Sequence, residues 1–268
     1  MQPMPQRLMA VLAHPDDEAL GIGSTLATYA ARGVETYVVT ATRGERGRFF
    51  TNEDRPSDAE VGRVREAELR ASARELGVRE VALLDYMDGQ LDQATPHEAI
   101  GRIVAQLRRV RPQVVVTFDP FGAYGHADHV AISQLTTAAV HAAADDAFPA
   151  DASPHSVSKL YYFVTTAVRW AAYQAAFKRM TSCVDGVERA ATAWPSWAVS
   201  AEIDARHAWA AAWRAVRCHE SQIAVYAGLE DLTPEQHEAL WGSGTFYRVF
   251  SRVNGSRALE SDLFEGVC

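Results

Sequence analysis

Cysteine is scarce in this chain, and long hydrophobic runs are missing. The three cysteines, Cys183, Cys218 and Cys268, are an odd number at wide spacing, and no two form a Cys-x-x-Cys pair. This spacing excludes a disulfide framework and does not indicate a thiolate zinc site. No stretch has the roughly 20 consecutive apolar residues of a membrane-spanning helix, and the first apolar run is too short for a signal peptide. We therefore expect a cytoplasmic protein with free thiols and no membrane span.

Positively charged residues are also fewer than negatively charged ones. The chain has 26 lysines and arginines against 34 aspartates and glutamates, so its net charge is −8. This balance argues against a nucleic acid or an anionic membrane as the main partner. A small, neutral or polar substrate is easier to accommodate. The sequence leaves the oligomeric state open, a homo-oligomer included.

Apolar runs alternate with helical patterns through the first half of the chain. Strands are predicted at residues 8–12, 35–41, 81–84 and 114–118, and helices at 19–32, 58–76, 96–110 and from about 128. Such alternation indicates parallel strands joined by right-handed crossovers, with helices on both faces of the sheet. The expected fold class is therefore α/β, with a Rossmann-like, doubly wound and mostly parallel sheet.

The pattern loosens beyond residue 150. A strand at 160–165, helices around 170–180 and 204–226, and a closing strand at 245–253 predict a smaller C-terminal α/β extension. Neither an internal repeat nor a low-complexity linker divides the chain. We expect a single domain over 1–268, in which residues 1–150 form the core with a metal site and residues 151–268 shape the substrate cleft.

All six tryptophans lie in the second half of the chain. Trp209 and Trp213 are spaced as on one face of a helix, which is typical of core packing. Trp194 and Trp197, in a predicted loop, are better candidates for lining a cleft.

The first chemical motif follows the first strand directly and reads Ala13-His14-Pro15-Asp16-Asp17-Glu18. One aspartate would suffice to cap the helix that follows. Three carboxylates and an imidazole in five residues instead repel one another and lose water at the end of a buried strand. A bound cation would relieve that repulsion.

The second motif, Gly125-His126-Ala127-Asp128-His129, follows the fourth strand. Because parallel strands end at the same edge of a sheet, we expect the two motifs to converge there. His14, Asp17 and His129 then supply two imidazoles and a carboxylate, which suit a catalytic zinc with an open position for water. The same ligands accept Fe²⁺ or Co²⁺.

The remaining polar residues of the two motifs suggest roles in catalysis. Asp16 would be the general base that takes a proton from the attacking water and passes it to the leaving group. His126, as an imidazolium held by Asp128 or another acid, would stabilise the oxyanion of a tetrahedral intermediate, and Tyr124 would add a hydrogen bond to it. The charged loop at residues 42–48 fits either a solvated loop or a lid that contacts substrate.

The paired motifs resemble those of the LmbE/PIG-L family of zinc-dependent N-acetylglucosaminyl deacetylases, over roughly residues 5–225. The resemblance implies that His14, Asp17 and His129 bind zinc, that Asp16 is the base and that His126 stabilises the oxyanion. It also implies removal of an N-acetyl group from a GlcNAc-type sugar or glycoconjugate, giving acetate and a free amine. The chain departs from the commonest family pattern at Ala127, where proline is frequent.

Three further residues are assigned by the same resemblance. Arg65 and Asp88 are expected to contact sugar hydroxyls. His219, in Cys218-His219-Glu220-Ser221-Gln222, resembles part of the family's His-x-Ser-Gln stretch and is expected to line the pocket. The sequence does not select one substrate among the amino sugars.

Three other functions compete with this one. The chain could be an amidase of the same family that acts on a thiol-sugar conjugate. His14, Asp16 and a distant His129 also match the triad of non-haem Fe(II) oxygenases. Gly21-Ile22-Gly23 suggests a nucleotide-binding module, although Leu26 stands where the dinucleotide fingerprint needs its third glycine.

Overall fold

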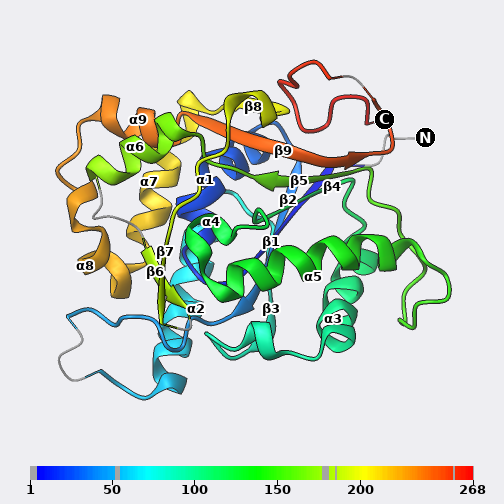
Figure 1. Cartoon of the computed structure of the whole chain (residues 1–268), viewed down its shortest axis with the longest axis horizontal. Helices are drawn as coiled ribbons and strands as arrows, with labels where there is room; N and C mark the ends of the chain where they lie inside the picture. Colours follow the sequence, from blue (N-terminus) through cyan, green and yellow to red (C-terminus); the bar gives the residue numbers. More distant parts are fainter. Residues whose placement is uncertain (1–4, 52–54, 177–180, 185, 256, 268) are drawn as a thin grey trace.

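A computed structural model describes residues 5–51, 55–176, 181–184, 186–255 and 257–267. A seven-stranded sheet crosses the molecule in the order β3-β2-β1-β4-β5-β9-β8 (Figure 1). Its strands are β1 (Arg7–Leu12), β2 (Glu35–Thr42), β3 (Glu80–Tyr86), β4 (Val114–Thr117), β5 (Lys159–Phe163), β8 (Ala201–Asp204) and β9 (Ser243–Ser251). The first five run parallel, whereas β9 is antiparallel to both β5 and β8.

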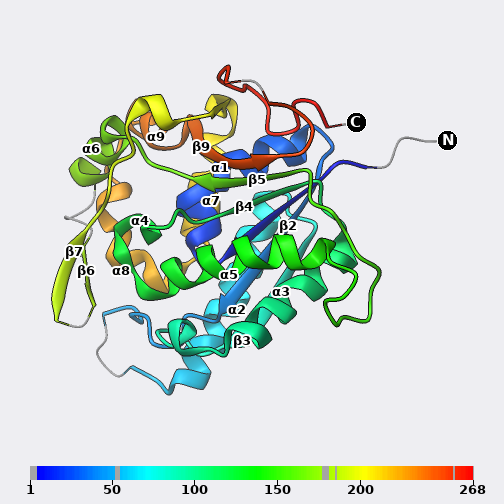
Figure 2. The same ribbon diagram turned by 45° about the vertical axis from the view of Figure 1, so that its right-hand side comes forward.

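Helices cover both faces of this sheet (Figure 2). On one face, α3 (Pro96–Val110) packs against α5 (Ala127–Ala144). On the other, α1 (Asp17–Ala31), α2 (Asp58–Glu75) and α7 (Trp209–Arg217) pack together. Two-sided cover explains why β1 and β4 are continuous apolar runs, since both faces of these central strands are buried. The predicted Rossmann-like fold class is confirmed.

Most of the predicted elements are present with small shifts in their ends. The helix predicted from residue 19 begins at Asp17, so the acidic motif forms its first turn. The helix predicted around 204–226 is instead divided into the 3₁₀ turn η3 (Arg206–Ala208), α7, the 3₁₀ turn η4 (Glu220–Gln222) and α8 (Ile223–Tyr226), and Asp204 ends β8. Of the predicted helix at 170–180, α6 (Ala167–Ala176) is described, and residues 177–180 lie outside the described part.

Several elements had no counterpart in the prediction. A hairpin of β6 (Thr181–Val184) and β7 (Val187–Ala190) stands apart from the main sheet and packs on the short helix α4 (Gly122–Gly125). Helix α9 (Pro234–Trp241) begins at a capping box of Thr233 and Gln236.

The tryptophans predicted for the core do pack there. Trp209 and Trp213 are half-buried, with ring centroids 5.5 and 4.8 Å from the ring of His237 on α9. Trp194 and Trp197 lie in the loop before β8, and Trp197 is 87% exposed. Among the described residues, no helix combines the length and the apolar character that crossing a bilayer requires.

The C-terminal segment is fastened to the start of β5. The buried ammonium of Lys159 donates to Glu260 over 2.7 Å, and the Tyr161 hydroxyl donates to the other carboxylate oxygen. Asn254 and Arg248 also donate to Glu260. This cluster lies at the amino end of the parallel strands, opposite the edge that carries the two motifs.

Candidate active site

The turn after β1 directs its carboxylates by backbone geometry. Asp17 Oδ2 accepts hydrogen bonds from the backbone amides of His14 at 2.8 Å and Ala13 at 3.2 Å, which turns this carboxylate back toward His14. Asp16 precedes α1 with φ 105° and ψ −25°, in the left-handed region. A non-glycine residue held there costs on the order of 1–3 kcal/mol. The surrounding contacts must therefore hold Asp16 in place.

The loop after β4 brings His129 to the same edge of the sheet. His129 is buried, its ring stacks on Phe118 with centroids 4.0 Å apart, and its Nδ1 lies 3.3 Å from the carbonyl oxygen of Gly122. A carbonyl only accepts, so Nδ1 carries the proton and Nε2 has the lone pair. Gly122 is required because its φ is 61° and an added Cβ would meet Val130 N at 2.9 Å.

The predicted ligand atoms of the two motifs converge, although 115 residues separate the two histidines. His14 Nδ1 lies 3.1 Å from His129 Nε2. Asp17 Oδ1 lies 3.5 Å from His129 Nε2, and Asp17 Oδ2 lies 3.8 Å from His14 Nδ1. A tetrahedral zinc with bonds of roughly 2.0–2.1 Å has ligand atoms about 3.3–3.4 Å apart. The observed spacing and the donor types therefore fit a metal ion.

The other nitrogen of His14 faces two carboxylates. His14 Nε2 lies 3.1 Å from Asp88 Oδ1 and 3.1 Å from Asp128 Oδ2. Asp128 is itself held by the backbone amides of Gly89 and Leu91, at 2.7 and 3.0 Å. Nε2 therefore donates its proton to the carboxylates, which leaves Nδ1 as the ring nitrogen that faces His129 and Asp17. Carboxylates bound to the far nitrogen commonly orient metal-ligating histidines in this way.

Among the described residues, two groups of three donors have one ligand atom per residue within 4.8 Å of one another, and both include His14. They are His14, His126 and His129, and His14, Asp88 and Asp128. The second group is the weaker candidate, because both of its carboxylates already accept the proton of His14 Nε2. The structure thus favours a metal on the Nδ1 side of His14.

Burial and neighbouring charges shift the pKa values of all three predicted ligands. Burial lowers the pKa of His14, but hydrogen bonds to Asp128 and Asp88 and the charge of Asp17 outweigh it and raise that pKa to about 10. Burial raises the pKa of Asp17 to about 7. Burial and the neighbouring charge of His14 lower the pKa of His129. A divalent cation would satisfy all three groups at once.

The predicted base, Asp16, lies beside this cluster without joining the donor groups described above. Its Oδ2 accepts a hydrogen bond from Arg65 Nη2 at 3.1 Å. Arg65 also donates to the carbonyl oxygens of Pro15 and Gly44, and only 4% of its surface is exposed. Its guanidinium therefore holds the Asp16 turn, and the expected contact of Arg65 with sugar hydroxyls stays a prediction.

Two other residues expected to contact substrate also have protein partners. Asp88 binds His14 Nε2 and accepts from the backbone amide of Arg46 at 3.1 Å. His219 is fully buried, and its Nε2 lies 2.7 Å from Glu18 Oε1. The prediction that His219 lines the pocket is therefore not supported, because no part of its side chain is exposed.

The ring of His126 stands over the cluster, with its centroid 4.7 Å from that of His14 and 4.9 Å from that of His129. The sequence predicts that the Asp128 carboxylate holds this ring, and the structure differs on that point. His126 Nδ1 accepts from the backbone amide of Asp128, while the Asp128 carboxylate faces His14. Burial lowers the pKa of His126, which favours a neutral ring, with its proton on Nε2, over the expected imidazolium. Burial raises the pKa of Tyr124, which keeps its hydroxyl protonated.

The charged loop after β2 is neither a simple solvated loop nor a free lid. Glu45 is buried and accepts the backbone amides of Asp88 and Arg43, each at 3.2 Å. Further along, Phe50 N donates to the carbonyl oxygen of Ser221. The loop is thus fastened to the site at one end and to η4 at the other. Glu18 and Glu45 are the buried site carboxylates that sequence reasoning missed, although Glu18 stands within the first motif.

Two competing functions lose their structural basis. The His14, Asp16 and His129 triad of an oxygenase is not assembled, because Asp17 faces the imidazoles and the Asp16 carboxylate binds Arg65. Gly21 and Gly23 lie inside α1, where an added Cβ would meet Phe163 at 3.1 Å and Ala212 at 3.3 Å. They serve helix packing and form no phosphate-binding turn.

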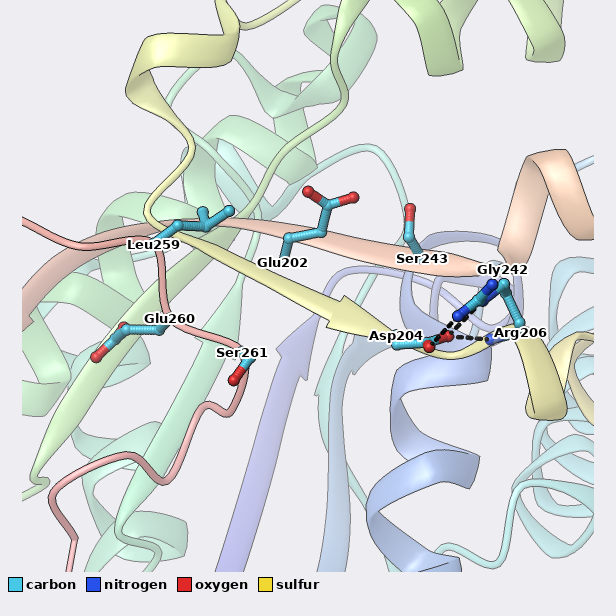
Figure 3. Close-up of a pocket in the computed structure, with 8 residues that line it drawn as sticks. All are labelled: Glu202, Asp204, Arg206, Gly242, Ser243, Leu259, Glu260 and Ser261. Carbon is cyan, nitrogen blue, oxygen red and sulfur yellow. Dashed lines mark hydrogen bonds and ion pairs between the residues drawn. The ribbon is translucent and has the colours of Figure 1, made fainter.

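Among the cavities in the described part of the chain are two of similar volume. One, of about 370 Å³, lies between β8, β9 and the C-terminal segment and includes none of the predicted site residues (Figure 3). The other, of about 310 Å³, adjoins the start of α5, next to Asp128 and His129. Its lining residues are Leu91, Asp92, Ala94, Pro96, Ala127, Val130, Ala131, Gln134, Leu135 and Arg189.

Comparison with known proteins agrees with this geometry. The PIG-L family (GlcNAc-PI de-N-acetylase) matches residues 9–140. A 1D-myo-inositol 2-acetamido-2-deoxy-alpha-D-glucopyranoside deacetylase from Streptomyces griseus is 34% identical over 299 residues, which cover 98% of this chain and 89% of that protein.

Solved structures give the same result for the fold. A conserved protein from Thermus thermophilus has a TM-score of 0.66 at 26% identity, covering 92% of this chain and 96% of that one. N,N'-diacetylchitobiose deacetylase from Pyrococcus horikoshii has a TM-score of 0.68 at 22% identity, and the match covers 92% of this chain and 84% of that one. With its two motifs joined at one edge of this fold, the chain belongs to the PIG-L family.

Proposed function

We propose that this protein is a metal-dependent N-deacetylase that hydrolyses the acetamido group of a GlcNAc-type sugar or glycoconjugate. The observation that carries the proposal is the convergence of His14 Nδ1, His129 Nε2 and the two oxygens of the Asp17 carboxylate, next to Asp16 in the sequence. Relatives that share about a third of their residues with this chain are named as deacetylases of an acetamido sugar joined to inositol. The products would be acetate and a free amine.

Zinc is the metal that the donor set suits best. His14 Nδ1, Asp17 Oδ1 and His129 Nε2 would hold it, and Fe²⁺ or Co²⁺ would be accepted by the same atoms. When bound, the ion supplies a Lewis acid that polarises the acetamido carbonyl and makes water a stronger nucleophile at neutral pH. Asp128 and Asp88 fix the ring of His14 from the other side.

Asp16 moves the proton in this proposal. Its carboxylate takes a proton from the water that attacks the carbonyl carbon, and then gives that proton to the nitrogen as the C–N bond breaks. The hydrogen bond from Arg65 fixes the direction of the carboxylate. The amide and one water thus become acetate and an amine without a further reactant.

His126 stabilises the negative charge that develops on the carbonyl oxygen. Because its Nδ1 accepts the amide of Asp128, the proton of the neutral ring lies on Nε2 and can be donated to that oxygen. The proposed role is the one expected from the sequence, with a neutral ring in place of an imidazolium. The Tyr124 hydroxyl, on a ring 5.3 Å from that of His129, supplies a second donor.

The C-terminal part shapes the cleft around this centre. Arg189 of β7 packs against Gly125 and lines the cavity beside the start of α5. Trp194 Nε1 donates to Asp119, which follows β4, and the Trp194 ring lies 5.9 Å from that of Phe121. Residues 1–150 would thus hold the metal, and residues 151–268 would help select the substrate.

Acetate release tests the proposal. Zinc-loaded protein is incubated with GlcNAc, chitobiose, GlcNAc-inositol, GlcNAc-malate and an N-acetylated glycopeptide, and acetate and free amine are quantified. We expect equal amounts of both products from at least one of these substrates, and none after chelation. Release of neither product from any of them by metal-replete protein would overturn the proposed function.

A further inference from the structure

The backbone of Asp16 is held from several directions. Its φ of 105° places it in a region that L-residues rarely adopt, at the first residue before α1. Its carbonyl accepts the amides of Ala19 and Leu20, as at any helix start, and Arg65 binds both the Asp16 carboxylate and the preceding carbonyl. Its own N–H points to a different partner.

That partner is the carboxylate of Glu18. The Asp16 N–H donates to Glu18 Oε2 at 2.9 Å, two residues along the chain. Glu18 is fully buried, so it does not face substrate. A carboxylate so placed needs other donors, because burying a charge without them is costly.

Those donors come from two distant elements. Ser72 of α2 and His219, which lies between α7 and η4, both bind Glu18 Oε1, at 2.5 and 2.7 Å. Both residues are fully buried, and His219 is 201 residues from Glu18 in the sequence. The C-terminal part of the chain therefore reaches the Asp16 turn through a continuous chain of hydrogen bonds.

We propose that Glu18, with His219 and Ser72 behind it, is a positioning network that keeps Asp16 in its left-handed conformation and so aims the Asp16 carboxylate. The inference rests on the proposed function in one respect, which is the role of Asp16 as the base. The network touches neither substrate nor metal. It acts on the backbone of the residue that transfers the proton.

Such a network has a distinctive effect on kinetics. Metal binding depends on Asp17, His14 and His129, and substrate binding does not involve a fully buried carboxylate. Loss of Glu18 therefore affects the step that needs an accurately aimed Asp16, where a displacement of about 1 Å costs on the order of 10²-fold. Turnover should fall while KM and metal content stay unchanged.

Variants that remove or keep the acceptor of the Asp16 N–H at position 18 test this inference. Glu18→Ala in the zinc-loaded protein should lower kcat about 10- to 100-fold, with KM within about twofold and full zinc content. Glu18→Gln should recover most of the loss, since its side-chain oxygen can still accept the Asp16 N–H. The control is Glu260→Ala, which truncates an equally buried carboxylate at the opposite end of the sheet and should leave kcat within about twofold.

His219 gives a second pair of variants if Glu18→Ala does not fold. His219→Gln keeps a donor near the position of Nε2, whereas His219→Leu removes it, and only the latter should lower kcat. A loss of kcat in Glu18→Ala no larger than that in Glu260→Ala would overturn the proposed network. Equal losses of kcat in His219→Gln and His219→Leu would also overturn it.

A structural readout separates this inference from the proposed function. A crystal structure of Glu18→Ala should show Asp16 out of the left-handed region, with its carboxylate displaced. An unchanged φ at Asp16 would overturn the inference even if the wild-type protein is an active deacetylase. If the wild-type protein releases no acetate but φ changes as expected, the proposed function fails and the positioning network stands.

Discussion

The carboxylate of Asp128 accepts a hydrogen bond from His14 Nε2 at 3.1 Å, and not from the ring of its near neighbour His126. This pairing joins the first turn of α5 to the turn that follows β1. It fixes which nitrogen of His14 carries the proton and leaves Nδ1 facing His129. The orientation of the proposed metal site therefore depends on a residue that is not itself a proposed ligand.

Replacing Asp128 should weaken the metal site without removing a ligand. In Asp128→Ala we expect zinc affinity to fall about 10- to 100-fold, because the ring of His14 is no longer oriented. Titration with a competing chelator measures this change. An affinity equal to that of the wild-type protein would show that Asp128 does not orient the site.

Asp16 and His129 should separate turnover from metal binding. Asp16→Ala should lower kcat about 10²- to 10⁴-fold and keep one zinc per chain, since the role proposed for this residue is to move a proton and not to bind the metal. His129→Ala should lose both turnover and bound zinc. Zinc content by atomic absorption beside acetate release distinguishes the two variants, and a metal-replete but inactive His129→Ala protein would contradict the assigned roles.

His126 should contribute to the transition state more than to substrate binding. Removal of an oxyanion donor typically costs about 10²- to 10³-fold in kcat. We expect His126→Ala to fall in this range with zinc retained, and we expect KM to change little. A large rise in KM at constant kcat would instead place His126 in ground-state binding.

The Glu260 cluster predicts a dependence of stability on pH. Burial raises the pKa of Glu260, but hydrogen bonds from Lys159, Tyr161 and Asn254 outweigh it, so the folded pKa lies below the ordinary value of about 4.3. A lowered carboxylate pKa stabilises the fold above the unfolded pKa, and this stability is lost as the pH falls through the folded value.

Urea unfolding of the wild-type protein and of Glu260→Gln at several pH values checks the direction of this pH dependence. The wild-type advantage in free energy of unfolding should be largest at pH 6 and shrink steadily toward pH 3. An advantage that grows on acidification would contradict the assigned direction.

The parallel half of the fold could be predicted from the sequence because its strands are short apolar or β-branched runs that alternate with helical patterns and end at polar turns. The hairpin could not, since all of β7 is exposed and carries no alternation of apolar and polar residues. Helix α9 did leave a signal, the capping box of Thr233 and Gln236, which periodicity alone does not detect.

The convergence of His14, Asp17 and His129 could also be predicted, because strand order places both motifs at one edge of the sheet. The partners of His219 and Arg65 could not. Whether a histidine at position 219 faces a cleft or a buried Glu18 depends on how α7 packs against α1, and sequence spacing does not contain that information.

The position of the metal tests the account most directly. Anomalous diffraction at the zinc edge from crystals of the zinc-loaded protein should give one peak within bonding distance of His14 Nδ1, Asp17 and His129 Nε2. A peak on the opposite side of His14, between Asp88 and Asp128, or no peak at this edge of the sheet, would contradict it.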